Sequence, residues 1–130
     1  MNPWAQFKSK SFNIIDLGKA AVFYIPVKKL RGKKGIRIRQ DLYLFLVAQF
    51  GANSVAVTPT ELRLGQWRND SGLTVIDKCV AFEISFAGKE KILPLMERLT
   101  KLAQEINEEC IYFKAGEDSC LIVPKKVRRA

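Results

Sequence analysis

Hydrophobic residues occupy every second position along five stretches of the chain, and this period of two predicts β-strands. The two longest stretches are joined by Asn69-Asp70-Ser71-Gly72, a sequence typical of a hairpin turn. Pro26 marks the end of the first stretch or a position at a sheet edge. The predicted strands are residues 19–27, 54–67, 73–86, 110–114 and 119–123.

Two other stretches, residues 36–50 and 90–107, repeat hydrophobic residues every three or four positions, which predicts amphipathic helices. Gly51 follows the first stretch, where glycine commonly ends a helix. Pro94 lies in the first turn of the second helix or else kinks it. Leu44 and Val47 widen the hydrophobic surface of the first helix beyond one packing face, so we expect additional burial there.

The predicted order is β-α-β-β-α-β with a further hairpin strand. This order favours an α+β fold of the ferredoxin-like kind, an antiparallel sheet with both helices on one face. We assign residues 19–124 to this domain, residues 1–18 to an N-terminal arm and residues 125–130 to a basic tail. The arm is too hydrophobic to remain free in water, and it packs on its own domain or on a second subunit.

Short motifs in the chain resemble those of a group of small, largely uncharacterised bacterial and phage proteins with a ferredoxin-like plait. They are Phe50-Gly51-Ala52-Asn53-Ser54, Gly65-Gln66-Trp67 and Gly72. The group usually has Phe-Gly-Gly-x-Thr, then Gly-x-Trp, then Gly followed by an acid. Here Ala52 replaces a glycine, Ser54 replaces the threonine, and Asp77 is the matched acid. The resemblance spans residues 20–123, implies the fold and carries no activity with it.

The length of 130 residues suits a single domain. There is no histidine, and the three cysteines lie within hydrophobic stretches without metal-ligand spacing, so we expect buried reduced thiols and neither metal nor cofactor. No hydrophobic run approaches the ~20 residues of a membrane-spanning helix. The N-terminus also lacks the features of a signal peptide, which predicts a cytoplasmic protein without a membrane partner.

Positive charge is concentrated at the two ends of the sequence. Residues 1–39 hold ten Lys and Arg and one acid, residues 40–124 hold eight bases and twelve acids, and the tail adds four bases, giving a net charge of +9. Cations before a helix N-terminus are mildly unfavourable unless an anion binds there. The hypothetical anion or nucleic-acid site comprises Lys28, Lys29, Arg31, Lys33, Lys34, Arg37, Arg39, Lys125, Lys126, Arg128 and Arg129.

Catalysis has little support in the sequence, because no Ser-His, Cys-His, phosphate-loop or zinc-ligand pattern is present. Glu83 is the exception, a carboxylate on a central strand that needs a partner such as Lys114 or Arg63 if it is covered. The residues hypothesised to form an interface on the open sheet face are Val22, Tyr24, Glu83, Tyr112 and Lys114.

The strand order also invites comparison with RNA-recognition domains, which stack bases on aromatic residues of the central strands. Residues 78–85 depart from the expected pattern at Cys79 and Val80, which leaves only Tyr24 and Tyr112 as possible stacking platforms. The leading interpretation is therefore a non-catalytic binding module that self-associates through its open sheet face or its arm. The alternative is a nucleic-acid or phosphate binder that uses residues 28–39 and 125–129, and an enzyme of unknown reaction comes third.

Overall fold

The computed structural model describes the backbone of residues 3–68 and 74–125 and the side chains of residues 3–58 and 78–125. The predicted turn at Asn69–Gly72 and the tail cations Lys126, Arg128 and Arg129 lie outside these residues. None of the described helices is long and hydrophobic enough to cross a membrane.

Five antiparallel strands form one sheet in the order β2-β3-β1-β4-β5. The central strand β1 pairs with both β3 and β4, although these strands are far apart in the sequence. This topology confirms the predicted α+β fold with its additional hairpin strand. The strands are β1 (Lys19–Pro26), β2 (Val55–Arg68), β3 (Thr74–Phe86), β4 (Ile111–Ala115) and β5 (Asp118–Ile122).

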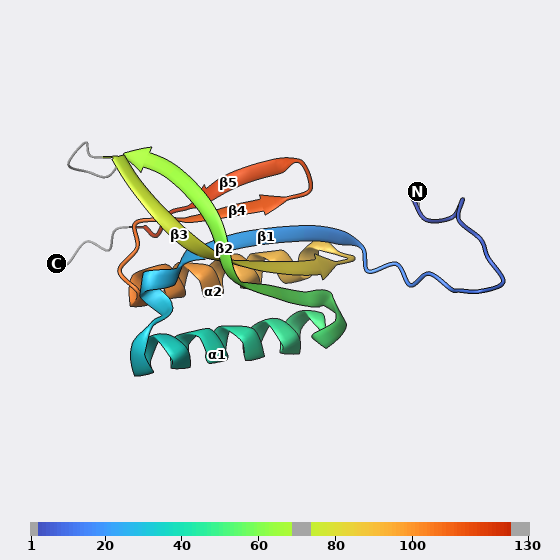
Figure 1. Ribbon diagram of the computed structural model, residues 1–130, viewed down its shortest axis with the longest axis horizontal. Coiled ribbons are helices and arrows are strands. Elements are labelled where there is room, and N and C mark those ends of the chain that lie inside the picture. Colours follow the sequence, from blue (N-terminus) through green and yellow to red (C-terminus); the bar gives the residue numbers. More distant parts are fainter. Residues whose placement is uncertain (1–2, 69–73, 126–130) are drawn as a thin grey trace.

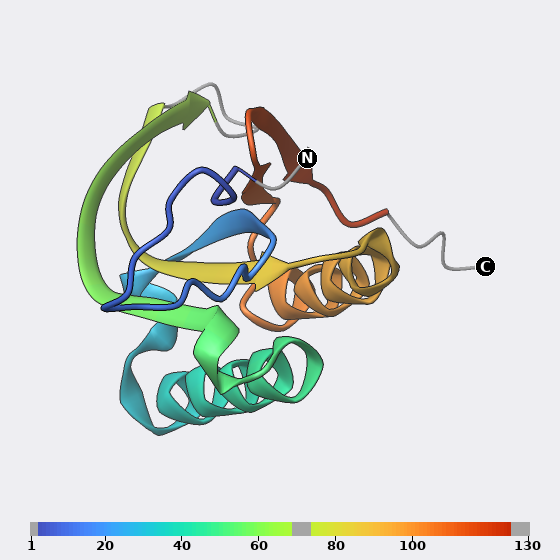
Figure 2. The same cartoon turned by 90° about the vertical axis from the view of Figure 1, so that its right-hand side faces the viewer.

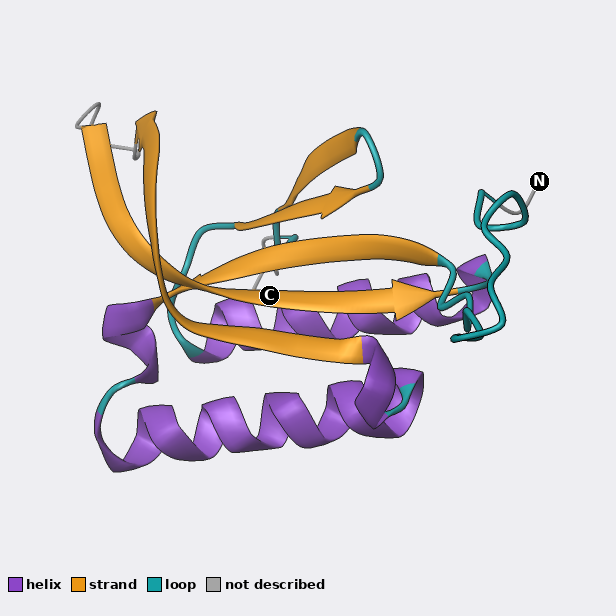
Figure 3. Cartoon of the chain, turned by 45° about the vertical axis from the view of Figure 1, so that its right-hand side comes forward, coloured by secondary structure: helices purple, strands orange, loops and turns teal. Residues whose placement is uncertain are grey.

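Both helices, α1 (Gly32–Phe50) and α2 (Ile92–Glu105), cover the same face of the sheet, as predicted (Figure 1). They lie side by side below it, whereas the β2–β3 ribbon curves away from them (Figures 2 and 3). The core lies between the two layers, where side chains that point down from the strands meet one stripe of each helix. Its fully covered members include Phe23, Ile25, Leu42, Leu46, Phe82, Ile84, Leu95, Leu99 and Leu102.

The basic segment before the first helix differs from the prediction of a loop. Residues Val27–Leu30 form a 3₁₀ turn, and α1 begins four residues earlier than expected. Gly35 makes this early start possible, because a Cβ atom at this position would overlap the backbone of Leu30. Leu30 is buried in the core, so the turn is anchored against the body of the domain. Pro94 falls in the first turn of α2, which follows the 3₁₀ turn Lys89–Lys91.

The N-terminal arm does not pack on its own domain. Every described residue from 3 to 20 is exposed, and the large hydrophobic side chains from Trp4 to Leu17 keep 41 to 82% of their surface in solvent. Leu44 on α1 is also 63% exposed, so the additional burial expected there is absent. Cys79 and Cys110 are half-buried and Cys120 is exposed, which corrects the prediction of three buried thiols, and none of the three forms a disulfide bond.

Candidate functional site

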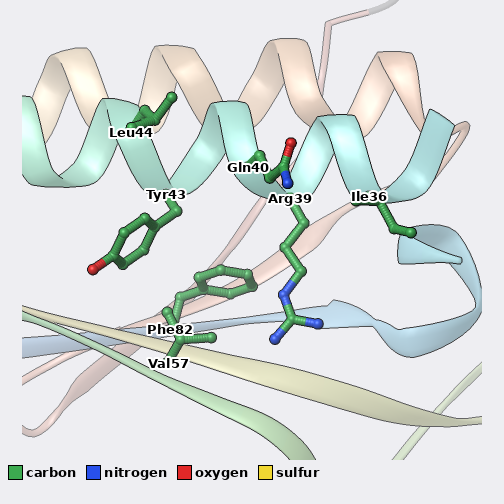
Figure 4. A pocket seen from close by; sticks show the side chains of 7 residues that line it. All are labelled: Ile36, Arg39, Gln40, Tyr43, Leu44, Val57 and Phe82. Carbon is green, nitrogen blue, oxygen red and sulfur yellow. The ribbon is translucent and has the colours of Figure 1, made fainter. Parts of the chain in front are cut away.

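A pocket of about 640 Å³ lies between α1 and the sheet, next to the edge strand β2. Residues from α1 supply one wall, and residues of β2 and β3 supply the floor (Figure 4). Its volume falls within the roughly 300–1,000 Å³ of small-molecule sites. The lining residues are Ile36, Arg39, Gln40, Tyr43, Leu44, Val57 and Phe82.

Helical spacing explains why these α1 side chains line the pocket together. Ile38, Leu42 and Leu46 form the buried stripe of α1, and Arg39 and Tyr43 follow one position later on successive turns. The guanidinium group and the phenol ring therefore project side by side from the helix toward the sheet (Figure 4). The pocket exists because this second stripe of α1 extends past the well-packed core.

The floor of the pocket is rigid and hydrophobic. Phe82 is fully buried, and its ring stacks on that of Phe23 with centroids 5.2 Å apart and planes 6° from parallel. Val57 lies directly opposite Phe82 on the neighbouring strand. A floor held in this way on two paired strands is well suited to support a flat ligand ring.

Among the described residues that line the pocket, Arg39 alone is charged. It is half-buried, and within the described part of the chain it has no carboxylate as an ion-pair partner. Hydrogen-bonding groups also come from the amide of Gln40 and the hydroxyl of Tyr43. The pocket thus combines a mostly hydrophobic surface with a few convergent polar groups and one positive charge, as binding sites commonly do.

The described members of the predicted anion-binding set lie at several places in the structure. Lys29 lies 3.9 Å from the carboxylate of Glu108. Lys28 is exposed in the 3₁₀ turn, Arg31 is exposed directly after it, and Lys33, Lys34 and Arg37 are exposed on the first turns of α1. Lys125 is exposed near the end of the described chain. Of the described members of the predicted set, Arg39 alone lines the pocket.

The residues of the predicted interface, by contrast, share the sheet face opposite the helices. Val22 is paired with Glu83 on β3 and with Lys114 on β4, so these three residues form one row across the sheet. The rings of Tyr24 and Tyr112 lie in the next row, with centroids 5.8 Å apart. The expected contact of Glu83 with Arg63 involves a side chain outside the described residues.

Cys110 has little nucleophilic character. Partial burial raises the pKa of its thiol above the ordinary value of 9.0, and the negative charges of Glu108 and Glu109 raise it further. No group of three or more Cys, Asp or Glu side chains suited to a metal ion occurs within the described residues.

The fold and the pocket define a small α+β protein with a partly open site between α1 and the sheet. No protein-family model matches the chain, and no curated protein matches it. One solved structure is similar: a phage SAM lyase in complex with S-methyl-5'-thioadenosine, with 15% sequence identity and a TM-score of 0.54. The match covers 92% of this chain and 100% of that one, and at this identity it shows a shared fold.

This comparison corrects the leading interpretation of the sequence. The prediction of a non-catalytic module is wrong, because the structure that shares the fold is that of an enzyme with a bound small molecule. The enzyme, placed third from the sequence, becomes the first hypothesis. The match to a phage protein also agrees with the resemblance to small phage proteins.

Sequence reasoning missed most of the pocket. Ile36, Gln40 and Tyr43 received no role because their spacing fits a solvent-exposed helix surface equally well. A usable signal was present in Arg39 and Tyr43, an arginine and an aromatic residue one turn apart beside a hydrophobic stripe.

Proposed function

We propose that this protein is an enzyme that binds a sulfur-containing adenosine compound in the pocket beneath α1. The observation that carries the proposal is the pocket itself, with its aromatic floor, its projecting phenol ring and its single guanidinium group. The similar phage SAM lyase, which holds S-methyl-5'-thioadenosine, suggests the class of ligand.

Each part of such a ligand has a suitable neighbour in the pocket. An adenine ring is flat and fits the space between the ring of Tyr43 and the side chain of Val57, which lies opposite the buried Phe82. The amide of Gln40 suits the donors and acceptors of adenine or ribose. S-adenosylmethionine also carries a carboxylate, with which the guanidinium of Arg39 forms paired charge-assisted hydrogen bonds.

The charge of the pocket suits a reaction in which a sulfonium ion loses its charge. When the bond between sulfur and the four-carbon amino-acid chain breaks, the electron pair stays on sulfur and leaves a neutral thioether. In the same step the chain either loses a proton to solvent from the neighbouring carbon and forms a double bond, or its own carboxylate attacks the carbon that leaves sulfur and closes a lactone. Because the described lining contains a cation and no acid, it stabilises the neutral thioether better than the sulfonium ion, which favours bond cleavage.

The test is to incubate the purified protein with S-adenosylmethionine and to measure S-methyl-5'-thioadenosine by chromatography. Calorimetric titration with S-methyl-5'-thioadenosine measures binding separately. We expect Tyr43→Ala to weaken binding by roughly 3- to 10-fold, as the loss of one aromatic contact does. Leu93→Ala, an exposed position on α2 outside the pocket lining, is the control and leaves binding unchanged.

The Arg39→Gln variant tests whether Arg39 binds the carboxylate of the ligand. We expect roughly 10-fold weaker binding of S-adenosylhomocysteine, which carries the carboxylate, because a hydrogen bond to a charged group contributes about 1.5 kcal/mol or more. Binding of S-methyl-5'-thioadenosine, which lacks the carboxylate, stays within about twofold, since that bond is absent from the complex. If the wild-type protein neither binds these compounds nor forms product at millimolar concentration, the proposed function is wrong.

A further inference from the structure

The open face of the sheet carries one negative and one positive side chain on either side of a hydrophobic residue. Glu83 on β3, Val22 on β1 and Lys114 on β4 are direct neighbours in one row, and both charged residues are exposed. Adjacent strands are about 4.8 Å apart, so the backbones of Glu83 and Lys114 are separated by roughly 10 Å with Val22 midway.

The neighbouring row is largely hydrophobic. It runs from buried Ala81 through the half-buried rings of Tyr24 and Tyr112 to Leu121, which is 59% exposed on β5. The hydrophobic side chains of such a row are exposed to water, which is unfavourable unless another surface covers them. The two helices lie on the opposite side of the sheet and do not cover it (Figure 1).

We propose that a second copy of this chain binds to the open face, with a two-fold axis close to Val22. Rotation about that axis exchanges the two ends of the charged row. Glu83 of each copy then lies opposite Lys114 of the other, and the tyrosine rows cover each other. A two-fold contact must be self-complementary in this way, and a surface with one charge of each sign on either side of its centre meets the requirement.

The row of Glu83, Val22 and Lys114 disfavours a nucleic acid as the partner that binds the open face. Phosphates that cross the sheet would pass the carboxylate of Glu83, and Lys114 alone does not offset that repulsion. A uniformly acidic or basic protein surface would likewise attract one of the two charged side chains, Glu83 or Lys114, and repel the other. The charge pattern therefore selects a second copy over these partners.

The size of the face sets the strength of the contact. A face five strands wide, with strands about 4.8 Å apart, and as long as β1, β4 and β5, which have five to eight residues, gives on the order of 500 Å² from each copy. A total near 1,000 Å² is at the low end of specific interfaces. We therefore expect a dimer that dissociates on dilution through the micromolar range.

Sedimentation velocity at protein concentrations between 1 and 100 μM tests the proposal. It compares the wild type with variants in which the charges of Glu83 and Lys114 are reversed. We expect the wild type to dimerise as concentration rises, and Glu83→Lys and Lys114→Glu each to shift dissociation at least 10-fold toward higher concentration, because like charges then face each other. The double variant, Glu83→Lys with Lys114→Glu, regains the wild-type behaviour. Glu97→Lys and Lys101→Glu make the same charge changes at exposed positions of α2 and leave the dimer intact.

Circular dichroism confirms that each variant is folded, as expected for exposed positions. A wild type that remains monomeric at 100 μM overturns the proposal. So do single variants that dimerise as well as the wild type, or a folded double variant that stays monomeric.

Discussion

Replacing Gly35 by alanine should destabilise this protein, although the same change stabilises most helices. Gly35 lies in the fourth position of α1, and alanine is favoured over glycine in a helix by about 1 kcal/mol. The new Cβ atom would lie 2.8 Å from the Cα and 2.9 Å from the carbonyl oxygen of Leu30, and closer still to its carbonyl carbon. Non-bonded carbon atoms normally stay about 3.5–4.0 Å apart.

The overlap cannot be relieved by rotating a side chain, because all three atoms belong to the backbone of the 3₁₀ turn. The turn and the helix must separate by about 1 Å, which pulls the buried Leu30 side chain out of its packing. Overpacking of this kind costs about 1–3 kcal/mol, and we take the upper half of the range because backbone must move. After subtracting the gain in helix propensity, the expected net loss is about 1–2 kcal/mol.

Thermal unfolding followed by circular dichroism measures this loss, and we expect Tm to fall by roughly 3–8 °C. Lys34→Ala is the matched control, since its neighbouring position on the same helix is exposed and its stability should change by less than about 0.5 kcal/mol. A Gly35→Ala protein as stable as the wild type would refute the close approach of helix and turn.

Two further predictions concern the pocket floor and the half-buried thiol. Phe82→Ala should lower the free energy of unfolding, measured in urea, by about 3–5 kcal/mol, because it removes a fully buried ring that stacks on Phe23. A loss below about 1 kcal/mol would contradict this packing. Phe7→Ala on the exposed arm is the control. The raised pKa leaves less Cys110 thiolate at neutral pH, so its alkylation by iodoacetamide, followed by peptide mass spectrometry, should rise with a midpoint above pH 9.0. Glu109→Gln removes one nearby negative charge and should lower that midpoint, and an unchanged midpoint would count against the electrostatic cause.

The sequence predicted the sheet well because one of its faces is strongly hydrophobic. Along β1 and β3 the core residues, such as Phe23 and Phe82, are separated by single polar or smaller residues, so a shift of one position would expose the whole core. The alternation therefore identified which residues face the helices. It also placed Val22, Glu83 and Lys114 on the same open face.

The start of α1 was mispredicted for a reason that lies outside the local sequence. The lysine-rich residues 28–35 have no hydrophobic period, and the two glycines among them lower helix propensity, which indicates a loop. Two tertiary contacts override that preference: Leu30 is buried in the core, and Gly35 allows α1 to approach its backbone. Neither contact can be recognised from a few neighbouring residues of the sequence.

The pocket was also beyond the reach of sequence patterns, because it depends on how α1 lies over the paired strands β2 and β3. Arg39 was predicted only as one of many cations, and Tyr43 was given no role. Leu44 shows the opposite error, since a hydrophobic residue beside the core stripe was expected to be covered and lies in solvent. Helical spacing gives the direction of a side chain but not the surface that it meets.

The central position of β1 has a consequence for synthesis on the ribosome. This strand is made before both of its neighbours, which end at residues 86 and 115. Until β4 has emerged, one edge of β1 lacks its partner, so the nascent domain exposes a hydrophobic strand. The sheet can therefore close only after residue 115 has left the ribosome, with slow kinetics typical of distant strand pairing.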